Sequence, residues 1–225
     1  MPPQPTAHQT SLFDPTDEAD RADALAEVAR AAKECQACPL WEIGTQTVFG
    51  SGPADARLMF VGEAPGQQED RQGKPFVGPA GSLFDQALAR AGIDRPEVYV
   101  TNTVKHRPWQ AQNGRQKNRA PKQSEINACR PWLTEELRLI GPELIVCLGA
   151  VAAKAILGRD FKLTQQRGQW LPGPNGAEVL ATLHPSYVLI QPTESRERVE
   201  ETFFGDVRTV GERYRTLKAR QQRAG

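Results

Sequence analysis

Three polar side chains follow apolar runs of the sequence directly, at Glu63, Asn102 and His184. A carboxylate can orient a water molecule, an amide can both donate and accept hydrogen bonds, and an imidazole can donate one to developing negative charge. The first run continues into a loop rich in glycine and proline that carries Phe76. Such a loop can press a flat ring against backbone amides, although the loop by itself does not favour this over the alternative. The alternative is an ordinary strand-to-helix turn with a core phenylalanine.

The loop after residue 62 differs from the common nucleotide-binding loops. Gly66 and Gly73 have six residues between them where a P-loop has four, and Pro75 occupies the place of the Ser or Thr that binds Mg²⁺. No G-x-G-x-x-G follows the apolar run. The sequence therefore predicts neither a P-loop nor a dinucleotide site.

Cysteine and histidine form a second candidate site. Cys35 and Cys38 have C-x-x-C spacing, and His106 and Cys129 follow further along the chain. Three thiolates and an imidazole can hold Zn²⁺ or a [4Fe–4S] cluster, and the spacing does not decide between them. We expect the fourth cysteine, Cys147, to pack as a small hydrophobe because it lies inside an apolar run.

Strands alternate with helices along the predicted order of elements, which favours a parallel sheet covered on both faces. Ligands bind such sheets at the carboxyl ends of the strands, so the three polar side chains should share one edge. The segment from Arg107 to about Lys122 is expected to be irregular. Strands are predicted at 56–64, 97–102, 143–150 and 177–185, and helices at 13–35, 81–93, 123–140, 151–157 and 196–221.

Composition sets further bounds. The 225 residues favour a single domain over residues 14–225, after a segment rich in proline and glutamine, residues 1–13, that we expect to be disordered. A net charge of +1 excludes a uniformly basic protein, so any binding to nucleic acid must depend on a local basic cluster. The N-terminus lacks the apolar stretch of a secretory signal and nothing indicates a membrane protein, so we expect a reducing cytoplasm without a disulfide framework.

An ordered set of motifs resembles the iron–sulfur uracil-DNA glycosylases of family 4. The motifs are C-x-x-C, VGEAPG…GKPFVGPAG, YVTNTVK, NRAP, LIVCLGAVAA and TLHPSYVL, and the similarity covers roughly residues 30–215. It implies an α/β/α fold with a central four-stranded parallel sheet, removal of uracil from DNA to leave an abasic site, and a structural [4Fe–4S] cluster, with zinc as the alternative. It also implies a monomer that acts on single- or double-stranded uracil-containing DNA in a bacterial-type cytoplasm, associated with the nucleoid during repair.

The resemblance also suggests roles for the pocket residues. Phe76 would form the floor under the pyrimidine, and Asn102 would match uracil O4 and N3–H but not cytosine. His184 would donate to O2 as charge develops there, and Glu63 would position or activate water and help to stabilise the cationic sugar. Backbone contacts would come from Gly62 and Ala64.

Two groups of residues are expected to contact DNA, although a solvated charge cluster and the start of a helix are the alternatives. One is a basic cluster that could contact phosphates, and the other is the segment after His184, which could fill the space that the flipped base leaves. They comprise Lys105, Arg107, Arg115, Lys117, Asn118, Arg119 and Lys122, and Ser186, Tyr187, Val188 and Leu189.

The sequence departs from the family 4 pattern at two points. His106 replaces a usual cysteine, and the segment from His106 to Cys129 is longer, as in the X-type branch that crosslinks itself to uracil-containing DNA. That branch has Gln where this chain has Ala64, and a loop KRRIH whose His bonds the sugar; here the aligned loop RQKNR places Asn118 at that position. An amide nitrogen is a poor nucleophile, so we expect hydrolysis with turnover. The alternatives are an X-type protein that binds uracil-DNA tightly or covalently and, more remotely, a non-enzymatic metal-stabilised nucleic-acid-binding domain.

Overall fold

The computed structural model describes residues 18–224, with the side chains of the last few left out. The predicted disordered segment, residues 1–13, lies outside this range, as does the start of the first predicted helix. A central sheet has the strand order β2-β1-β5-β7-β6. Its first four strands are parallel, and β6 pairs with β7 in the antiparallel direction. The strands are β1 (Leu58–Gly62), β2 (Tyr99–Asn102), β5 (Leu144–Leu148), β6 (Trp170–Pro172) and β7 (Glu178–Thr182).

The four predicted parallel strands are therefore confirmed, and a fifth strand extends the sheet at one edge. Strand β6 has only three residues, and they are partly exposed. The sequence therefore has no apolar run that would have predicted this strand. β1, β2 and β5, in contrast, are buried along their whole length. This burial on both faces is typical of a parallel sheet between two helical layers.

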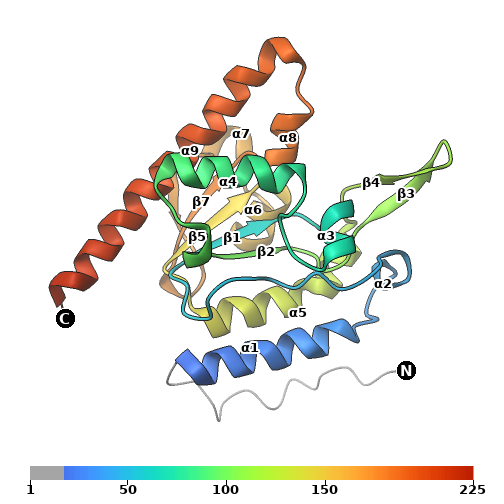
Figure 1. Ribbon diagram of the computed structural model, residues 1–225, viewed down its shortest axis with the longest axis horizontal. Helices are drawn as coiled ribbons and strands as arrows, with labels where there is room; N and C mark the ends of the chain where they lie inside the picture. Colours follow the sequence, from blue (N-terminus) through green and yellow to red (C-terminus); the bar gives the residue numbers. More distant parts are fainter. Residues whose placement is uncertain (1–17, 225) are drawn as a thin grey trace.

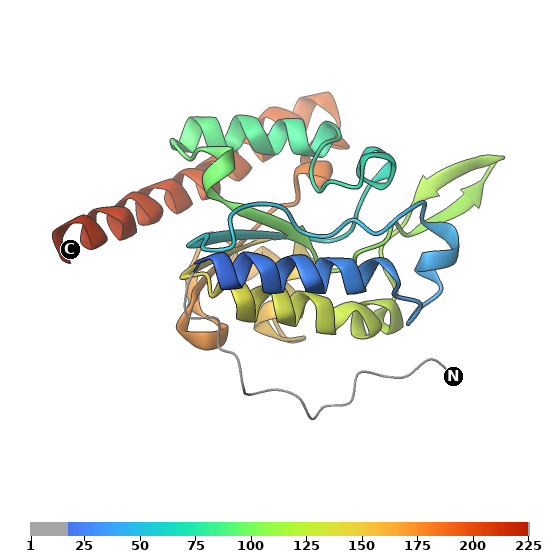
Figure 2. The ribbon, with the colours of Figure 1, turned by 60° about the horizontal axis from the view of Figure 1, so that its bottom comes forward.

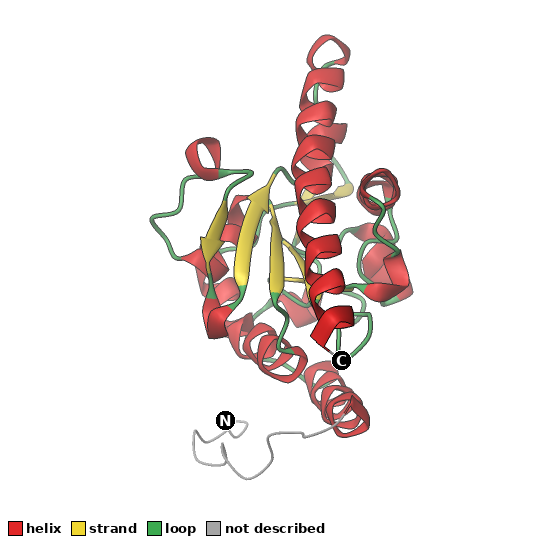
Figure 3. Cartoon of the chain, turned by 90° about the vertical axis from the view of Figure 1, so that its left-hand side faces the viewer, coloured by secondary structure: helices red, strands yellow, loops and turns green. Residues whose placement is uncertain are grey.

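Helices cover both faces of the sheet (Figures 1 and 3). One layer contains α4 (Pro79–Ala91) and α9 (Thr193–Ala224), and the other contains α1 (Glu18–Lys33), α5 (Gln123–Ile140) and α6 (Ala150–Leu157). In β1, Leu58 and Phe60 face the core beneath α4 and α9, whereas Met59 and Val61 face the core beneath α5 and α6. The alternation of a β-strand thus divides a single apolar run between two cores.

Local signals explain where the helices end. Helix α4 begins with Pro79 in its first turn and ends at Gly92, which has a φ of 67°. Proline is favoured at a helix start and glycine at a left-handed C-terminal position. The predicted bounds 123–140 coincide with α5, which ends before another left-handed glycine, Gly141.

The sequence suggested an irregular segment from Arg107 to Lys122. This prediction is wrong, because the segment contains an antiparallel hairpin. Strands β3 (Trp109–Gln112) and β4 (Arg115–Asn118) are joined by Asn113 and Gly114, both with positive φ. This pair is typical of a two-residue hairpin turn. The strands are exposed along most of their length, so no apolar alternation indicated them. The hairpin projects from the body of the protein (Figure 2).

Short helices complete the described chain, and none of its helices has the length and apolar character needed to cross a membrane. Two of the short helices, α3 and α8, follow β1 and β7 and thus lie beside the carboxyl ends of these strands. The short helices are α2 (Leu40–Ile43), α3 (Gln67–Gln72), α7 (Leu163–Gln166) and α8 (Pro185–Leu189), with single 3₁₀ turns at Arg95–Glu97 and Pro174–Gly176.

Candidate active site

A cavity of about 1020 Å³ lies at the carboxyl ends of β1, β2 and β7. Glu63, Asn102 and His184 all line it, together with Phe76, so the structure brings the four central residues of the sequence prediction together. Of the other predicted site residues, the lining includes Ala64, Asn118, Arg119, Ser186, Tyr187 and Leu189.

Phe76 is held in a strained conformation at the base of this cavity. Its φ is 55°, in the left-handed region that residues other than glycine rarely adopt. Its ring lies roughly parallel to that of His184, with the ring centroids 6.1 Å apart. A Cβ on Gly62 would lie 2.6 Å from Phe76 Cζ and 2.4 Å from Asn102 Oδ1, so the end of β1 requires glycine.

Glu69 positions the loop around Phe76, and sequence reasoning missed it. Its buried carboxylate accepts backbone N–H groups from Gly66, Val77 and Gly78 at 3.1, 3.0 and 2.7 Å. The carboxylate thus joins the chain before α3 to the chain after Phe76. A glutamate three residues after a helix N-cap is the pattern of a capping box, and this was the available signal.

His184 presents a hydrogen-bond donor to the cavity. Its Nδ1 accepts the backbone N–H of Ser186 at 3.1 Å, so in the neutral ring the proton resides on Nε2. Burial lowers the pKa of His184 to about 4, so the ring is neutral at neutral pH. Nε2 is buried and has no hydrogen-bond partner among the described residues.

Asn102 presents the second unpartnered group. Its side chain is buried, and its Oδ1 accepts no hydrogen bond from any residue between 18 and 224. Most buried polar atoms in proteins have partners, so these two atoms of one cavity are available to a ligand or to the water that it displaces. That ligand must present an acceptor to His184 and a donor to Asn102.

Glu63 is the acidic group of the cavity. Its side chain is half-buried, and burial raises the pKa of its carboxyl group above the ordinary value. Its backbone carbonyl accepts the N–H of Val104 at 3.2 Å, which ties the end of β1 to the chain after β2. The carboxylate is thus available to orient water in a partly dehydrated site.

The structure places the residues predicted to contact DNA in three kinds of environment. The contacts predicted for Lys105 and Arg107 are wrong, because both side chains are buried. Lys105 pairs with Glu136 in the interior, and the Arg107 guanidinium donates to Asn118 Oδ1 at 2.7 Å and to Gln116. Arg119 lines the cavity but is paired with Glu125. Arg115, Lys117 and Lys122 are exposed, as are Ser186 and Tyr187, and the contacts predicted for them stay predictions.

Three of the four predicted metal ligands lie in one corner of the protein. Burial raises the pKa values of Cys38 and Cys129, the latter to about 12, and the charges of neighbouring thiolates raise them further. Cys38 and Cys129 belong to one small apolar cluster, which also contains Trp132. Backbone N–H of Lys105 donates to Cys129 Sγ, and Trp132 Nε1–H donates to Cys35 Sγ, each at 3.2 Å.

The fourth predicted ligand, His106, is buried, and its Nε2 lies 3.0 Å from Thr47 Oγ1. Within residues 18–224 no three His, Cys, Asp or Glu side chains are arranged to hold a single metal ion. Cys147 is fully buried in β5, as predicted from its apolar surroundings.

The fold and the cavity define an α/β protein whose candidate site, at the carboxyl edge of its sheet, combines an aromatic ring with buried hydrogen-bonding groups. The chain belongs to the uracil DNA glycosylase superfamily, whose family model matches residues 49–208.

Proteins similar to this chain include uracil-DNA glycosylases of two types. A type-4 uracil-DNA glycosylase of Thermotoga maritima is 38% identical over 80% of this chain and 90% of its own length. One of Archaeoglobus fulgidus is 35% identical over 84% of this chain and 93% of its own. A type-5 uracil-DNA glycosylase of Pyrobaculum aerophilum is 31% identical over 65% of this chain and 68% of its own length.

Proposed function

We propose that this protein is a DNA-repair glycosylase that flips uracil out of DNA and hydrolyses its N-glycosidic bond. The observation that carries the proposal is the pair of unpartnered buried atoms, His184 Nε2 and Asn102 Oδ1, in one cavity with Phe76. Uracil offers O2 as an acceptor and N3–H as a donor, which matches the two atoms. Phe76 would support the face of the ring.

The chemistry follows from how this bond breaks. When the bond between C1′ and N1 breaks, its electron pair stays with uracil and the sugar becomes cationic. A neutral His184 that donates from Nε2 to O2 stabilises the uracil anion, as oxyanion-hole donors do in other enzymes. Glu63 as a carboxylate stabilises the sugar cation and orients the water that adds to C1′.

Turnover, not covalent capture, is the expected outcome. Asn118 lines the cavity, and Arg107 donates to its Oδ1, so only the amide nitrogen remains to face the ligand. Because the lone pair of an amide nitrogen is delocalised, Asn118 is a poor nucleophile toward the sugar. The free abasic DNA is therefore released.

We also propose that Cys35, Cys38, Cys129 and His106 bind a [4Fe–4S] cluster. Two observations support this proposal: Cys38 and Cys129 share one apolar cluster with Trp132, and the sulfurs of Cys129 and Cys35 each accept an N–H group, as cluster-ligating sulfurs do. In the described residues these side chains are not arranged around a single point, so binding would have to draw them together. Burial lowers the pKa of His106, which keeps the ring in its neutral, ligating form. The cluster would supply structural support, since its ligands are not among the residues that line the cavity.

DNA would approach over the mouth of the cavity. Tyr187 and Ile190, exposed by 48% and 76%, lie at this mouth and would fill the space that the base vacates. Arg115 and Lys117 on the hairpin would contact phosphates of the same strand. We propose that the protein acts as a monomer on single- or double-stranded DNA.

The test uses a labelled single-stranded oligonucleotide with one uracil, run on denaturing gels with and without alkali. A shortened strand that appears only after alkali supports base release with turnover. An oligonucleotide that stays intact after alkali contradicts glycosylase activity. A slow band that survives SDS and heat would instead indicate a covalent adduct and contradict the role argued for Asn118.

A further inference from the structure

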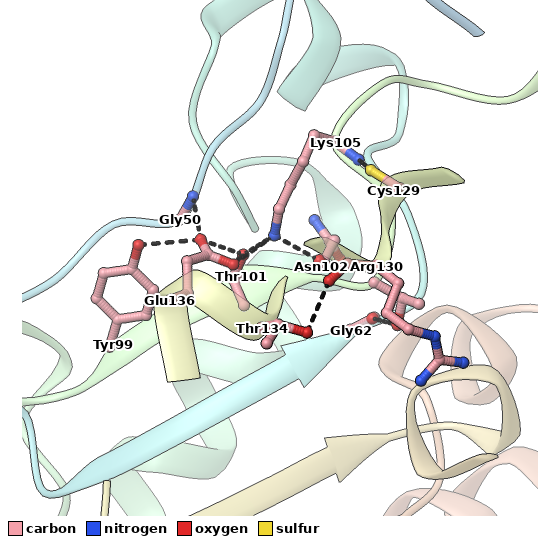
Figure 4. A network of polar contacts seen from close by, with 11 residues as sticks. Gly50, Gly62, Tyr99, Thr101, Asn102, Lys105, Cys129, Arg130, Thr134 and Glu136 are labelled. Carbon is pink, nitrogen blue, oxygen red and sulfur yellow. Dashed lines mark hydrogen bonds and ion pairs between the residues drawn. The ribbon is translucent and has the colours of Figure 1, made fainter. Parts of the chain in front are cut away.

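A buried ion pair lies directly behind the cavity residue Asn102 (Figure 4). Lys105 Nζ donates to Glu136 Oε2 at 2.5 Å, to Thr101 Oγ1 at 2.7 Å and to the backbone carbonyl of Asn102 at 2.8 Å. The side chains of Lys105 and Glu136 are 1% and 0% exposed. All three donors of the ammonium group are therefore used within the protein.

Glu136 extends this network to the edge of the sheet. Its Oε1 accepts the hydroxyl of Tyr99, the hydroxyl of Thr101 and the backbone N–H of Gly50, at 2.9 to 3.0 Å. A Cβ on Gly50 would lie 2.4 Å from that oxygen, so the covering chain approaches as closely as glycine allows. The network is fully satisfied and reaches from α5 to β2.

Net stability does not explain a charged pair at this position. Taking two charges out of water is costly, and apolar residues of similar volume often stabilise a protein as well or better. A fixed geometry is a property that such a pair can supply instead. The geometry that Lys105 fixes is the position of one carbonyl group, that of Asn102.

Asn102 needs this support because of its place in the sheet. β2 is an edge strand and ends at Asn102, whose Oδ1 has no hydrogen-bond partner in the described chain. The direction of the amide therefore depends on the backbone. Beyond Asn102 the chain is fixed again, because Thr103 N–H donates to Gly62 O and Lys105 N–H donates to Cys129 Sγ.

We infer that Lys105 and Glu136 are a positioning pair, which holds the Asn102 carbonyl so that the Asn102 amide matches the N3–H and O4 edge of uracil. The inference rests on the proposed function. The sequence suggested Lys105 as a phosphate contact. The inference instead assigns to Lys105 a role in base selection, which it exerts through Asn102.

The test replaces both charges at once, in Lys105→Met/Glu136→Leu, since removing one partner would leave the other buried and unpaired. The matched control is Lys218→Met/Glu97→Leu, which removes an ion pair between α9 and the 3₁₀ turn Arg95–Glu97. Thermal unfolding, kcat/KM on a uracil oligonucleotide and inhibition by free uracil are measured for each. We expect the first variant to remain folded and to lose about tenfold or more in both kcat/KM and uracil affinity, because a 1 Å misplacement can cost about 10²-fold.

Repeating the change in an Asn102→Ala background separates positioning from a general structural effect. If the pair acts through Asn102, replacing the pair should cause no further loss of kcat/KM in the Asn102→Ala variant. If it causes the same fold-loss in that variant as in the wild type, the inference is overturned. If the double variant fails to fold, Thr101→Val provides the same cycle, because it removes the hydroxyl that bridges both charges. An active wild type with an unimpaired positioning variant contradicts only this inference, whereas an inactive wild type contradicts the proposed function and this inference with it.

Discussion

His184 carries its proton on the nitrogen that faces the cavity because its other nitrogen already accepts a backbone N–H. Burial lowers its pKa to about 4, so no proton has to be gained or lost for it to donate at neutral pH. A neutral donor also avoids binding anions unselectively in the empty pocket. One backbone contact and desolvation are thus sufficient to give His184 the protonation state that the proposed role requires.

Replacing this donor should affect the chemical step. We expect His184→Ala to lower kcat by about 10² to 10³-fold, the usual effect of losing one oxyanion donor. Ser186→Ala is the matched control, since it keeps the backbone N–H that fixes the tautomer while it removes the hydroxyl that lies 2.7 Å from Nδ1. Single-turnover kinetics on a uracil oligonucleotide measure both. Undiminished uracil release by His184→Ala would refute the assigned role.

Glu63 should set the acid limb of the pH profile. Burial raises its pKa, so the catalytic carboxylate form is lost as the pH falls through a value above that of an ordinary glutamate. Glu63→Gln should remove this limb and lower kcat by about 10² to 10⁴-fold. A profile of kcat/KM against pH checks the expectation, and an acid limb that persists in the variant would assign it to another group.

The same shift has a consequence for stability. Because the folded pKa of Glu63 lies above the unfolded one, the folded state binds its proton more tightly, and the stability falls as the pH rises through this range. Glu63→Gln should therefore be at least as stable as the wild type at neutral pH. Urea unfolding at pH 7 measures this, and a clear loss of stability would mean that the carboxylate has a structural partner.

At the scale of elements, the cavity depends on how closely β1, β2 and the Phe76 loop approach one another. Gly62→Ala would place a Cβ at 2.4 Å from Asn102 Oδ1 and 2.6 Å from the Phe76 ring. We expect uracil release to fall by about 10²-fold, because both base contacts must shift. Gly205→Ala in α9, where nothing lies within 4 Å, should keep full activity and gain about 0.5 to 1 kcal/mol. Equal activity of the two variants would contradict the close packing.

The hairpin should contribute affinity for DNA without affecting the chemistry. Arg115→Ala/Lys117→Ala removes two exposed charges and should reduce the slope of log K against log salt by about 2 units or less, while kcat stays unchanged. Arg208→Ala/Lys218→Ala on α9 removes the same charge elsewhere. Binding to a uracil oligonucleotide at several salt concentrations measures the slopes. Equal slopes for the two variants would show that the hairpin makes no phosphate contact.

The elements with strong local patterns could be predicted from the sequence, whereas the hairpin could not be. The four parallel strands and α5 have long apolar runs, helical periodicity or glycine ends, which are local properties of the chain. The hairpin has polar residues on both faces, and its only signal was the pair Asn113–Gly114. β6 is too short to give a pattern.

In the site, residue type and strand-end position sufficed to place Glu63, Asn102 and His184 around one cavity. Residue type misled the prediction for Lys105, because a charged side chain is usually exposed. Its burial depends on Glu136, which lies far away in the sequence, on α5. For Glu69 the spacing after Gly66 was a local signal, but its contacts with Val77 and Gly78 are defined only by the folded loop.

At the scale of the whole molecule, the thiol corner joins segments that are far apart in the sequence: the chain after α1, the chain after β2, and α5. A group that binds all of them would act as a crosslink, and by analogy with disulfide crosslinks we expect it to stabilise the domain by about 2 to 4 kcal/mol. For a domain of this size, about 3 kcal/mol corresponds to roughly 10 °C in Tm. We therefore expect loss of the proposed cluster to lower Tm by about this amount and to disturb Asn102 through Lys105.

Two variants test this expectation. Cys35→Ser should abolish visible absorbance, lower the iron content and lower Tm, because a serine hydroxyl is a poor ligand for iron. Cys147→Ala removes a thiol that is buried in β5 and should keep both iron and absorbance, although the lost packing also costs stability. Absorbance, metal analysis and thermal unfolding of the purified proteins measure the difference. A colourless wild type with stoichiometric zinc would contradict the iron–sulfur cluster but not the proposal that a metal crosslinks these segments. A metal-free wild type with full activity would contradict both proposals.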